Sequence, residues 1–150
     1  MRTTFACLLL TLATLGTACS ESPDDHGLAA ARRQWADHLP AAYSFTWTQG
    51  CECISDMRRP IRISVTAGQL TSAVFVDDQR PVGEPVRGYL VTIDGVFDMI
   101  QAAIDQDAAK VTVEYDPARG YPRSVLVDYD RQVADEELAL QISDFAPPAN

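Results

Sequence analysis

The sequence predicts an α+β domain, a mostly antiparallel sheet of about five to six strands with two helices packed on one face. Short segments of alternating apolar and polar residues outnumber segments with helical periodicity, and tight turns join several of them. Two helices can cover one face of such a sheet, and the opposite strand positions are rich in serine and threonine. A partly closed barrel around the second helix is the alternative arrangement.

The size and charge of the chain fit one acidic globular domain. Its 150 residues are 47% apolar and 22% charged, which are ordinary values for a folded protein. Lysine and arginine number 12 against 21 aspartates and glutamates, giving a net charge of −9. Nucleic acids are bound through clustered basic residues, so we expect no nucleic-acid partner.

Residues 1–18 have the features of a signal peptide. Arg2 supplies a positive start, and the mainly apolar run over residues 5–15 is shorter than the ~20 residues that span a bilayer. Small residues then precede Cys19. Both a general signal peptidase and a lipoprotein signal peptidase would cut before this cysteine.

We favour the lipoprotein interpretation, with Cys19 as the lipidation site, although Leu15 lies one position earlier than in the usual signal. A diacylglyceryl thioether and an N-acyl chain such as palmitate would together anchor the protein stably. Ser20 follows the cysteine in place of aspartate, which favours the outer membrane, facing the periplasm, in a two-membrane bacterium. A secreted or periplasmic soluble protein is the alternative.

After cleavage, residues 19–27 are expected to form a flexible tether, residues 28–145 a single α+β domain, and residues 146–150 a tail. Removal of 18 residues would leave 132 of the 150 and take away one positive charge, so the net charge would become −10. An acidic body is repelled by anionic lipid, so membrane attachment would depend on the N-terminal lipid.

The first predicted helix begins at Leu28 and ends before Pro40, because a proline cannot continue a helix. Its apolar stripe recurs at helical spacing. The stripe consists of Leu28, Ala31, Trp35 and Leu39.

Three strands follow, at residues 42–48, 61–66 and 70–76, and the first two alternate apolar and polar side chains. Residues 67–69 form the turn between the last two, since Gly68 can adopt a positive φ. The inward residues of the first strand are Tyr43, Phe45 and Trp47, which we interpret as core and not as a binding platform.

The second half of the chain begins with a loop at residues 77–88. Thr92 is the predicted N-cap of the second helix. The apolar stripe of that helix consists of Ile93, Val96, Phe97, Ile100 and Ile104. Three strand faces follow, namely Val111, Val113 and Tyr115; Val125, Val127 and Tyr129; and Leu138, Leu140 and Ile142, with a proline–glycine turn at 116–120 between the first two.

The pair Cys51 and Cys53 is the sharpest local feature, because in an oxidising compartment two neighbouring thiols tend to form a disulfide. Such a bridge across one residue needs a bend, which Gly50 could permit, and it would fix the end of the first strand. Two alternatives stay open: thiol–disulfide exchange, and Cu(I) binding by the two thiolates with Met57.

Other groups of residues are weaker candidates for a functional site. An acidic C-terminal group could serve as paired catalytic carboxylates or as calcium ligands, although its spacing fits no calcium loop and turn carboxylates are usually solvated or capping. With two histidines, both near the N-terminus, we expect no enzyme, cofactor or metal site. The acidic group consists of Asp116, Asp128, Asp130, Asp135, Glu136 and Glu137.

A series of motifs follows in order along the chain, namely Trp35, Tyr43-Ser44-Phe45, Cys51-Glu52-Cys53, Thr92-Ile93-Asp94 with Phe97, Tyr115-Asp116-Pro117, Gly120-Tyr121-Pro122, Asp128 and Asp135-Glu136-Glu137. Their order resembles a bacterial lipoprotein-like family catalogued as domain of unknown function 6174, over about residues 28–145. The resemblance implies an exported envelope protein and no established activity. We therefore expect a non-catalytic module that binds an envelope protein or a small ligand through its helix-free sheet face, with thiol-redox or copper handling as the alternative.

Overall fold

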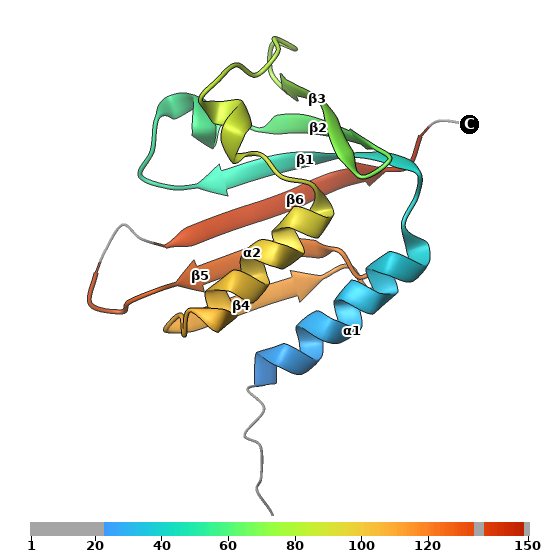
Figure 1. The fold of residues 1–150 in the computed structure, drawn as a ribbon. Coiled ribbons are helices and arrows are strands. Elements are labelled where there is room, and N and C mark those ends of the chain that lie inside the picture. The colour runs from blue at the N-terminus through green and yellow to red at the C-terminus, as the bar shows by residue number, and fades with distance from the viewer. Residues whose placement is uncertain (1–22, 134–136, 149–150) are drawn as a thin grey trace, which may run out of the picture.

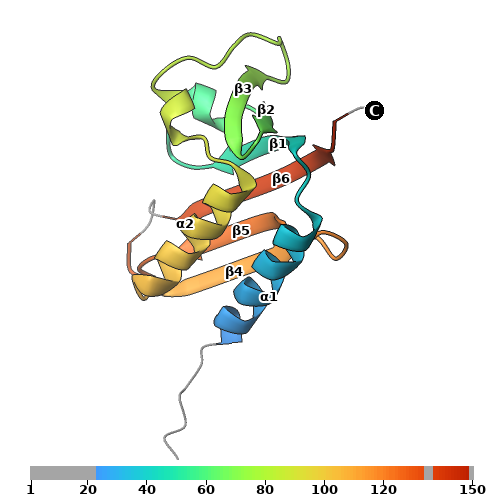
Figure 2. The same cartoon turned by 45° about the vertical axis from the view of Figure 1, so that its right-hand side comes forward.

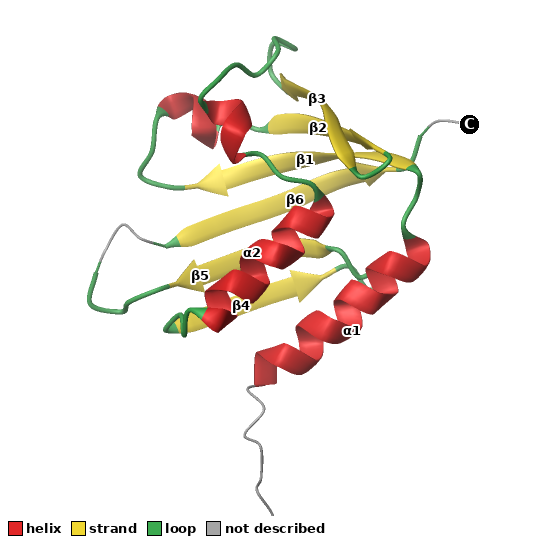
Figure 3. Ribbon diagram, in the orientation of Figure 1, coloured by secondary structure: helices red, strands yellow, loops and turns green. Residues whose placement is uncertain are grey.

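The computed structural model describes residues 23–133 and 137–148 (Figures 1 and 3). Within these residues two α-helices and two short 3-10 helices accompany a six-stranded sheet. In chain order the elements are α1 (Pro23–His38), β1 (Ala42–Gly50), η1 (Ser55–Arg58), β2 (Ile61–Thr66), β3 (Gln69–Phe75), η2 (Val86–Tyr89), α2 (Ile93–Asp105), β4 (Lys110–Tyr115), β5 (Pro122–Asp128) and β6 (Leu138–Ala146).

The strands lie in the order β3-β2-β1-β6-β5-β4, and every neighbouring pair is antiparallel. Figures 1 and 2 show both α-helices in front of the same face of the sheet. The predicted α+β class, strand number and layer arrangement are therefore confirmed. The barrel alternative is wrong, because β3 and β4 end the sheet on opposite sides.

The apolar residues of β1 and β2 face the helices in cross-strand pairs, as the alternation predicts. The two-residue turn after β2 has φ of 49° at Ala67 and 73° at Gly68, the left-handed geometry that joins antiparallel strands tightly. The buried pairs are Tyr43 with Val65, Phe45 with Ile63, and Trp47 with Ile61.

Helix α1 begins at Pro23, inside the segment 19–27 that the sequence assigns to a tether, so that assignment is wrong from Pro23 onward. A proline is tolerated in the first turn because the N–H that it lacks would have no intrahelical acceptor there. Residues 19–22 lie outside the described chain. The sequence predicts Leu39 in the buried stripe, but α1 ends at His38 and Leu39 is 46% exposed.

Trp35 is the centre of the core between α1 and the sheet. Its ring meets those of Tyr43, Tyr121 and Phe145 edge-on, with centroids 5.3, 6.2 and 5.7 Å away. Its indole N–H donates to Asp94 Oδ1 at 3.2 Å, which satisfies the polar atom of an otherwise buried side chain. One residue of α1 thus connects β1, β6 and α2.

The predicted turn at 116–120 is present, and its aspartate and glycine shape it. The Asp116 carboxylate accepts the backbone N–H groups of Ala118 and Arg119 at 3.1 and 2.8 Å. Gly120 has φ of +80°, and a Cβ there would lie 2.5 Å from the carbonyl oxygen of Ala31. Only glycine lets α1 approach this turn so closely.

Helix α2 begins as predicted, because the Thr92 side chain accepts the backbone N–H of Gly95. The backbone N–H of Ile93 donates to the hydroxyl of Tyr43 at 3.4 Å. Burial under this helix raises the pKa of Tyr43 to about 12. The buried residues of α2 are Ile93, Val96, Phe97, Ile100 and Ala103, and Ile104 of the predicted stripe is only partly buried.

Arg59 fixes the loop that follows β3. Its guanidinium lies 3.7 Å from the centroid of the Phe75 ring and forms ion pairs with Asp77 and Asp78. The backbone N–H of Arg80 bonds to the carboxylate of Asp78 and lowers the pKa of that group to about 2. This cluster holds the loop against the outer side of β3.

Two boundaries near the C-terminus differ from the prediction. Tyr129 lies beyond the end of β5 and is 37% exposed, because the chain turns at Asp130, whose carboxylate accepts the N–H of Gln132. Ala146, assigned to the tail, is the last residue of β6. Along the described chain, neither α-helix combines the length and apolar character that a membrane crossing requires.

Candidate functional site

The helix-free face of the sheet is polar and carries its own hydrogen-bond network. The Arg62 guanidinium donates to Ser44 Oγ at 2.8 Å and to the backbone oxygen of Asp144 at 2.7 Å, so it links β2, β1 and β6. Hydrogen bonds from Ser143 and Thr46 keep the pKa of the Asp144 carboxyl below its ordinary value. The predicted serine- and threonine-rich face is therefore a connected polar surface.

A cavity of about 470 Å³ lies on this face where β1 ends and β6 begins. Its volume is in the range of small-ligand sites. Its walls combine three carboxylates, one ammonium group and apolar side chains. The lining residues are Gly50, Cys51, Glu52, Lys110, Leu126, Asp128, Glu137 and Ala139.

Two opposite charges face one another in this cavity without forming an ion pair. Lys110 on β4 lies directly opposite Asp128 on β5. Within the described part of the chain, the only ion pairs involve other residues, and the buried Asp128 Oδ1 has no hydrogen-bond donor. A buried polar atom without a partner costs ~1–3 kcal/mol, which a ligand that donates a hydrogen bond would offset.

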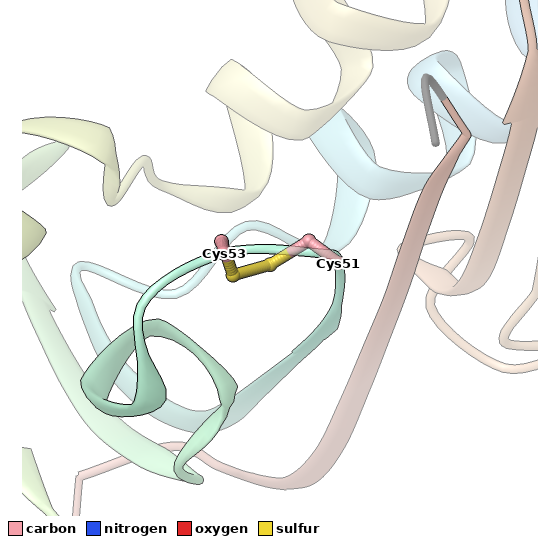
Figure 4. Close-up of a disulfide and its surroundings, with 2 residues drawn as sticks. All are labelled: Cys51 and Cys53. Carbon is pink, nitrogen blue, oxygen red and sulfur yellow. A yellow bond between two sulfur atoms is a disulfide. The ribbon is translucent and has the colours of Figure 1, made fainter. Parts of the chain in front are cut away.

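The predicted disulfide is present between Cys51 and Cys53, in the bend directly after β1 (Figure 4). The two Cα atoms are 5.2 Å apart, within the ordinary range for a disulfide. Just before it, a Cβ on Gly50 would lie 3.3 Å from the Cβ of Ala139 on β6. The bridge and the glycine together shape one wall of the cavity.

Over residues 27–147 the chain matches a family described as a family of unknown function, DUF6174. The chain belongs to the DUF6174 family. The matched segment begins inside α1 and ends just after β6, so it contains both the disulfide and the cavity. No curated protein and no solved structure matches this DUF6174 chain.

The alternatives for the cysteine pair of the DUF6174 domain stay predictions. In the bridged state neither sulfur is a thiolate, the form that attacks a disulfide or binds a metal. Met57 is partly buried and packs against the core. No group of three or more histidine, cysteine, aspartate or glutamate residues gathers into a metal site among the described residues.

The described members of the predicted acidic group do not form one cluster. Asp116 and Asp130 each accept backbone N–H groups of their own turn, as expected of turn carboxylates. Asp128 and Glu137 instead line the cavity. Outside the described residues lie Cys19, Asp135 and Glu136.

Lys110 is a cavity residue that the sequence pattern does not predict. The available signal was its outward position at the start of a strand, opposite the outward Asp128 at the end of the next strand. That signal identifies a pair and not a site, because the cavity also needs the ends of β1 and β6, which lie far away in the sequence.

Proposed function

We propose that this DUF6174 protein is a lipid-anchored protein of the bacterial cell envelope that binds a small ligand without catalysing a reaction. Cys19 is the proposed lipidation site and the periplasmic side of the outer membrane the proposed location, with a secreted or periplasmic soluble protein as the alternative. The signal-like residues 1–18 support this assignment, as does the Cys51–Cys53 bridge, because disulfides persist in oxidising compartments.

The observation that carries the binding proposal is the cavity with its separated charges. A small zwitterion, such as an amino acid or short peptide, would place its ammonium group against Asp128 and its carboxylate against Lys110. The side chains of Leu126 and Ala139 would receive its apolar part. The lining residues include no histidine or serine, and the one cysteine among them is bridged, so the proposal assigns binding alone.

Titration of the full-length lipidated protein in detergent micelles tests the site by amide NMR. Glycylglycine is the zwitterionic probe, with ethylamine and acetate as single-charge controls. We expect shifts at Lys110, Leu126 and Ala139, and an affinity about tenfold lower in Lys110→Gln and in Asp128→Asn, because each substitution removes a charged hydrogen bond.

The matched control is Ser64→Ala, in a separate cavity of about 250 Å³ at the other end of the helix-free face. This variant should bind glycylglycine as the unmodified protein does. Shifts that gather around Ser64, or an affinity unchanged in both cavity variants, would contradict the proposed site.

Cys19→Ser tests the anchor. The variant should move from the membrane fraction to the soluble fraction, because the acidic body has no lipid attachment of its own. If it stays in the membrane fraction, the anchor assignment is wrong.

A second candidate function is thiol-redox or copper handling by Cys51 and Cys53, which is favoured by the position of Cys51 in the cavity wall. Mass spectrometry of the envelope protein, with and without thiol trapping, tests it. Free thiols that carry copper would support copper handling. A bridge that survives mild reductant would exclude thiol exchange.

A further inference from the structure

The two edge strands of the sheet, β3 and β4, differ in whether another described segment pairs with their outer side. The outer side of β3 is covered by the loop that follows it, where Val74 forms a bridge with Pro81. The backbone N–H of Phe75 donates to Arg80 O, and that of Val82 donates to Ala73 O. Across the described residues, β4 has no such cover on its outer side. An uncovered edge strand is a template for pairing with another strand.

The hydrogen-bond pattern shows which backbone groups of β4 are free. Ala109 N–H donates to Tyr129 O on the β5 side, and bonding alternates along an antiparallel pair. As far as Val113, odd-numbered residues of β4 therefore bond to β5; beyond Glu114 the register shifts, and the N–H of Asp116 donates to Tyr121 O. The even-numbered residues Lys110, Thr112 and Glu114 direct their backbone N–H and C=O groups outward.

We propose that β4 pairs antiparallel with β4 of a second copy of this chain, with Thr112 on the two-fold axis. Free backbone groups meet only when even-numbered residues lie opposite one another. The register centred on Thr112 has the longest overlap of these, and it places Lys110 opposite Glu114 of the partner copy. Backbone hydrogen bonding and charge thus select the same register.

The side chains of β4 support a second copy as the occupant. Lys110 and Glu114 are exposed, and within the described chain neither belongs to an ion pair. In the pair, each would face its opposite charge across the new strand boundary. On the helix-covered side, the half-buried Val111 would face Val113 of the partner copy. An unrelated extended peptide would have no inherent reason to carry charged and apolar residues that match those of β4.

Helix α1 extends to the proposed strand boundary. In Figures 1 and 2 its first turns extend past β4, so they would lie over β4 of the partner copy. Ala29 and Ala30 in this part of α1 are exposed and small.

Cysteine cross-linking in intact cells that express the full-length chain tests the register. Thr112→Cys should form a disulfide-linked dimer on a non-reducing gel, because opposed Cα atoms of a hydrogen-bonded pair lie ~5.5 Å apart, within disulfide reach. Glu114→Cys is the matched control on the same exposed edge. Its cysteine would face Lys110 of the partner copy and should form no dimer.

Charge exchange tests the same pairing by analytical ultracentrifugation of the full-length protein in micelles. Lys110→Glu should raise the dimer dissociation constant about tenfold, because like charges then face each other twice. The double variant Lys110→Glu with Glu114→Lys should restore dimerisation. Asp128→Asn changes the cavity and leaves the edge intact, so it should dimerise normally, which separates this proposal from the ligand proposal.

Three results would overturn the inference. One is a protein that stays monomeric and gives no Thr112→Cys dimer. Another is equal cross-linking of Thr112→Cys and Glu114→Cys, which would exclude the register. The third is a Thr112→Cys adduct with a different protein, which would show that the edge receives a strand from another chain.

Discussion

The two faces of the sheet use alternate residues of the same strands for different purposes. On the helix-covered face, side chains such as Trp35 of α1 and Trp47 of β1 are each only 1% exposed. On the helix-free face, Arg62 joins neighbouring strands by hydrogen bonds, and Lys110 and Asp128 line an open cavity. This difference indicates that apolar packing on the helix-covered face supplies most of the stability, so the side chains of the helix-free face are less constrained by packing.

Trp35→Ala should give the largest effect, because it removes a buried indole that contacts α2 and the sheet. We expect the free energy of unfolding to fall by about 3–5 kcal/mol in urea denaturation. Thr48→Ala, on the helix-free side of β1, is the control and should change it by about 0.5 kcal/mol or less. Similar losses of unfolding free energy for the two variants would mean that the two faces contribute equally to stability.

Gly120→Ala should lower the free energy of unfolding by about 2–4 kcal/mol, since the new Cβ would lie 2.5 Å from the carbonyl oxygen of Ala31. Gly68→Ala is the comparison, because Gly68 also has a positive φ but nothing within 4 Å of a Cβ. Gly68→Ala should lower the free energy of unfolding by about 1 kcal/mol, from backbone strain alone. Equal urea midpoints for the two variants would show that the approach of α1 contributes nothing.

These contrasts also show which parts of the molecule the sequence could predict. The strand faces, the Thr92 cap and the glycine turns are local patterns, and each is present in the structure. The cavity is not local, because it brings together the end of β1, both strands of the β4–β5 pair and the start of β6. That assembly depends on the strand order, which no local period encodes. Leu39 was misplaced for a similar reason, since helical spacing continues past the residue where the helix ends.

Alkaline pH should lower the free energy of unfolding through Tyr43, which lies on the helix-covered face. The pKa of Tyr43 is about 12 in the folded protein against an ordinary 10. The unfolded chain therefore releases this proton first, so stability holds below pH 10 and falls as the pH rises from 10 to 12. Urea midpoints measured across this range should decrease less in Tyr43→Phe. Tyr89→Phe, which alters an exposed tyrosine, should behave as the unmodified protein does.

Arg62→Met should have the smallest effect on stability, less than about 1 kcal/mol, because Arg62 is partly exposed on the helix-free face. The pKa of Asp144 should rise only slightly, because the charge of Arg62 is the smallest cause of its lowering and the hydrogen bonds from Ser143 and Thr46 remain. NMR titration of the Asp144 carboxyl measures this shift. Arg80→Met is the control, since Arg80 bonds to Asp78 and not to Asp144. A loss of several kcal/mol would mean that the polar face also holds the fold together.

The position of β6 has a consequence for the order in which the chain folds. The last strand lies between β1 and β5, so the β1–β3 meander and the β4–β5 hairpin do not touch as strands until β6 arrives. Such long-range pairing slows folding, because a long stretch of chain must be ordered before the contact forms. Until then the inner edge of β1 stays open to incorrect pairing. The sheet is therefore completed from its middle, by a strand that follows the other five along the chain.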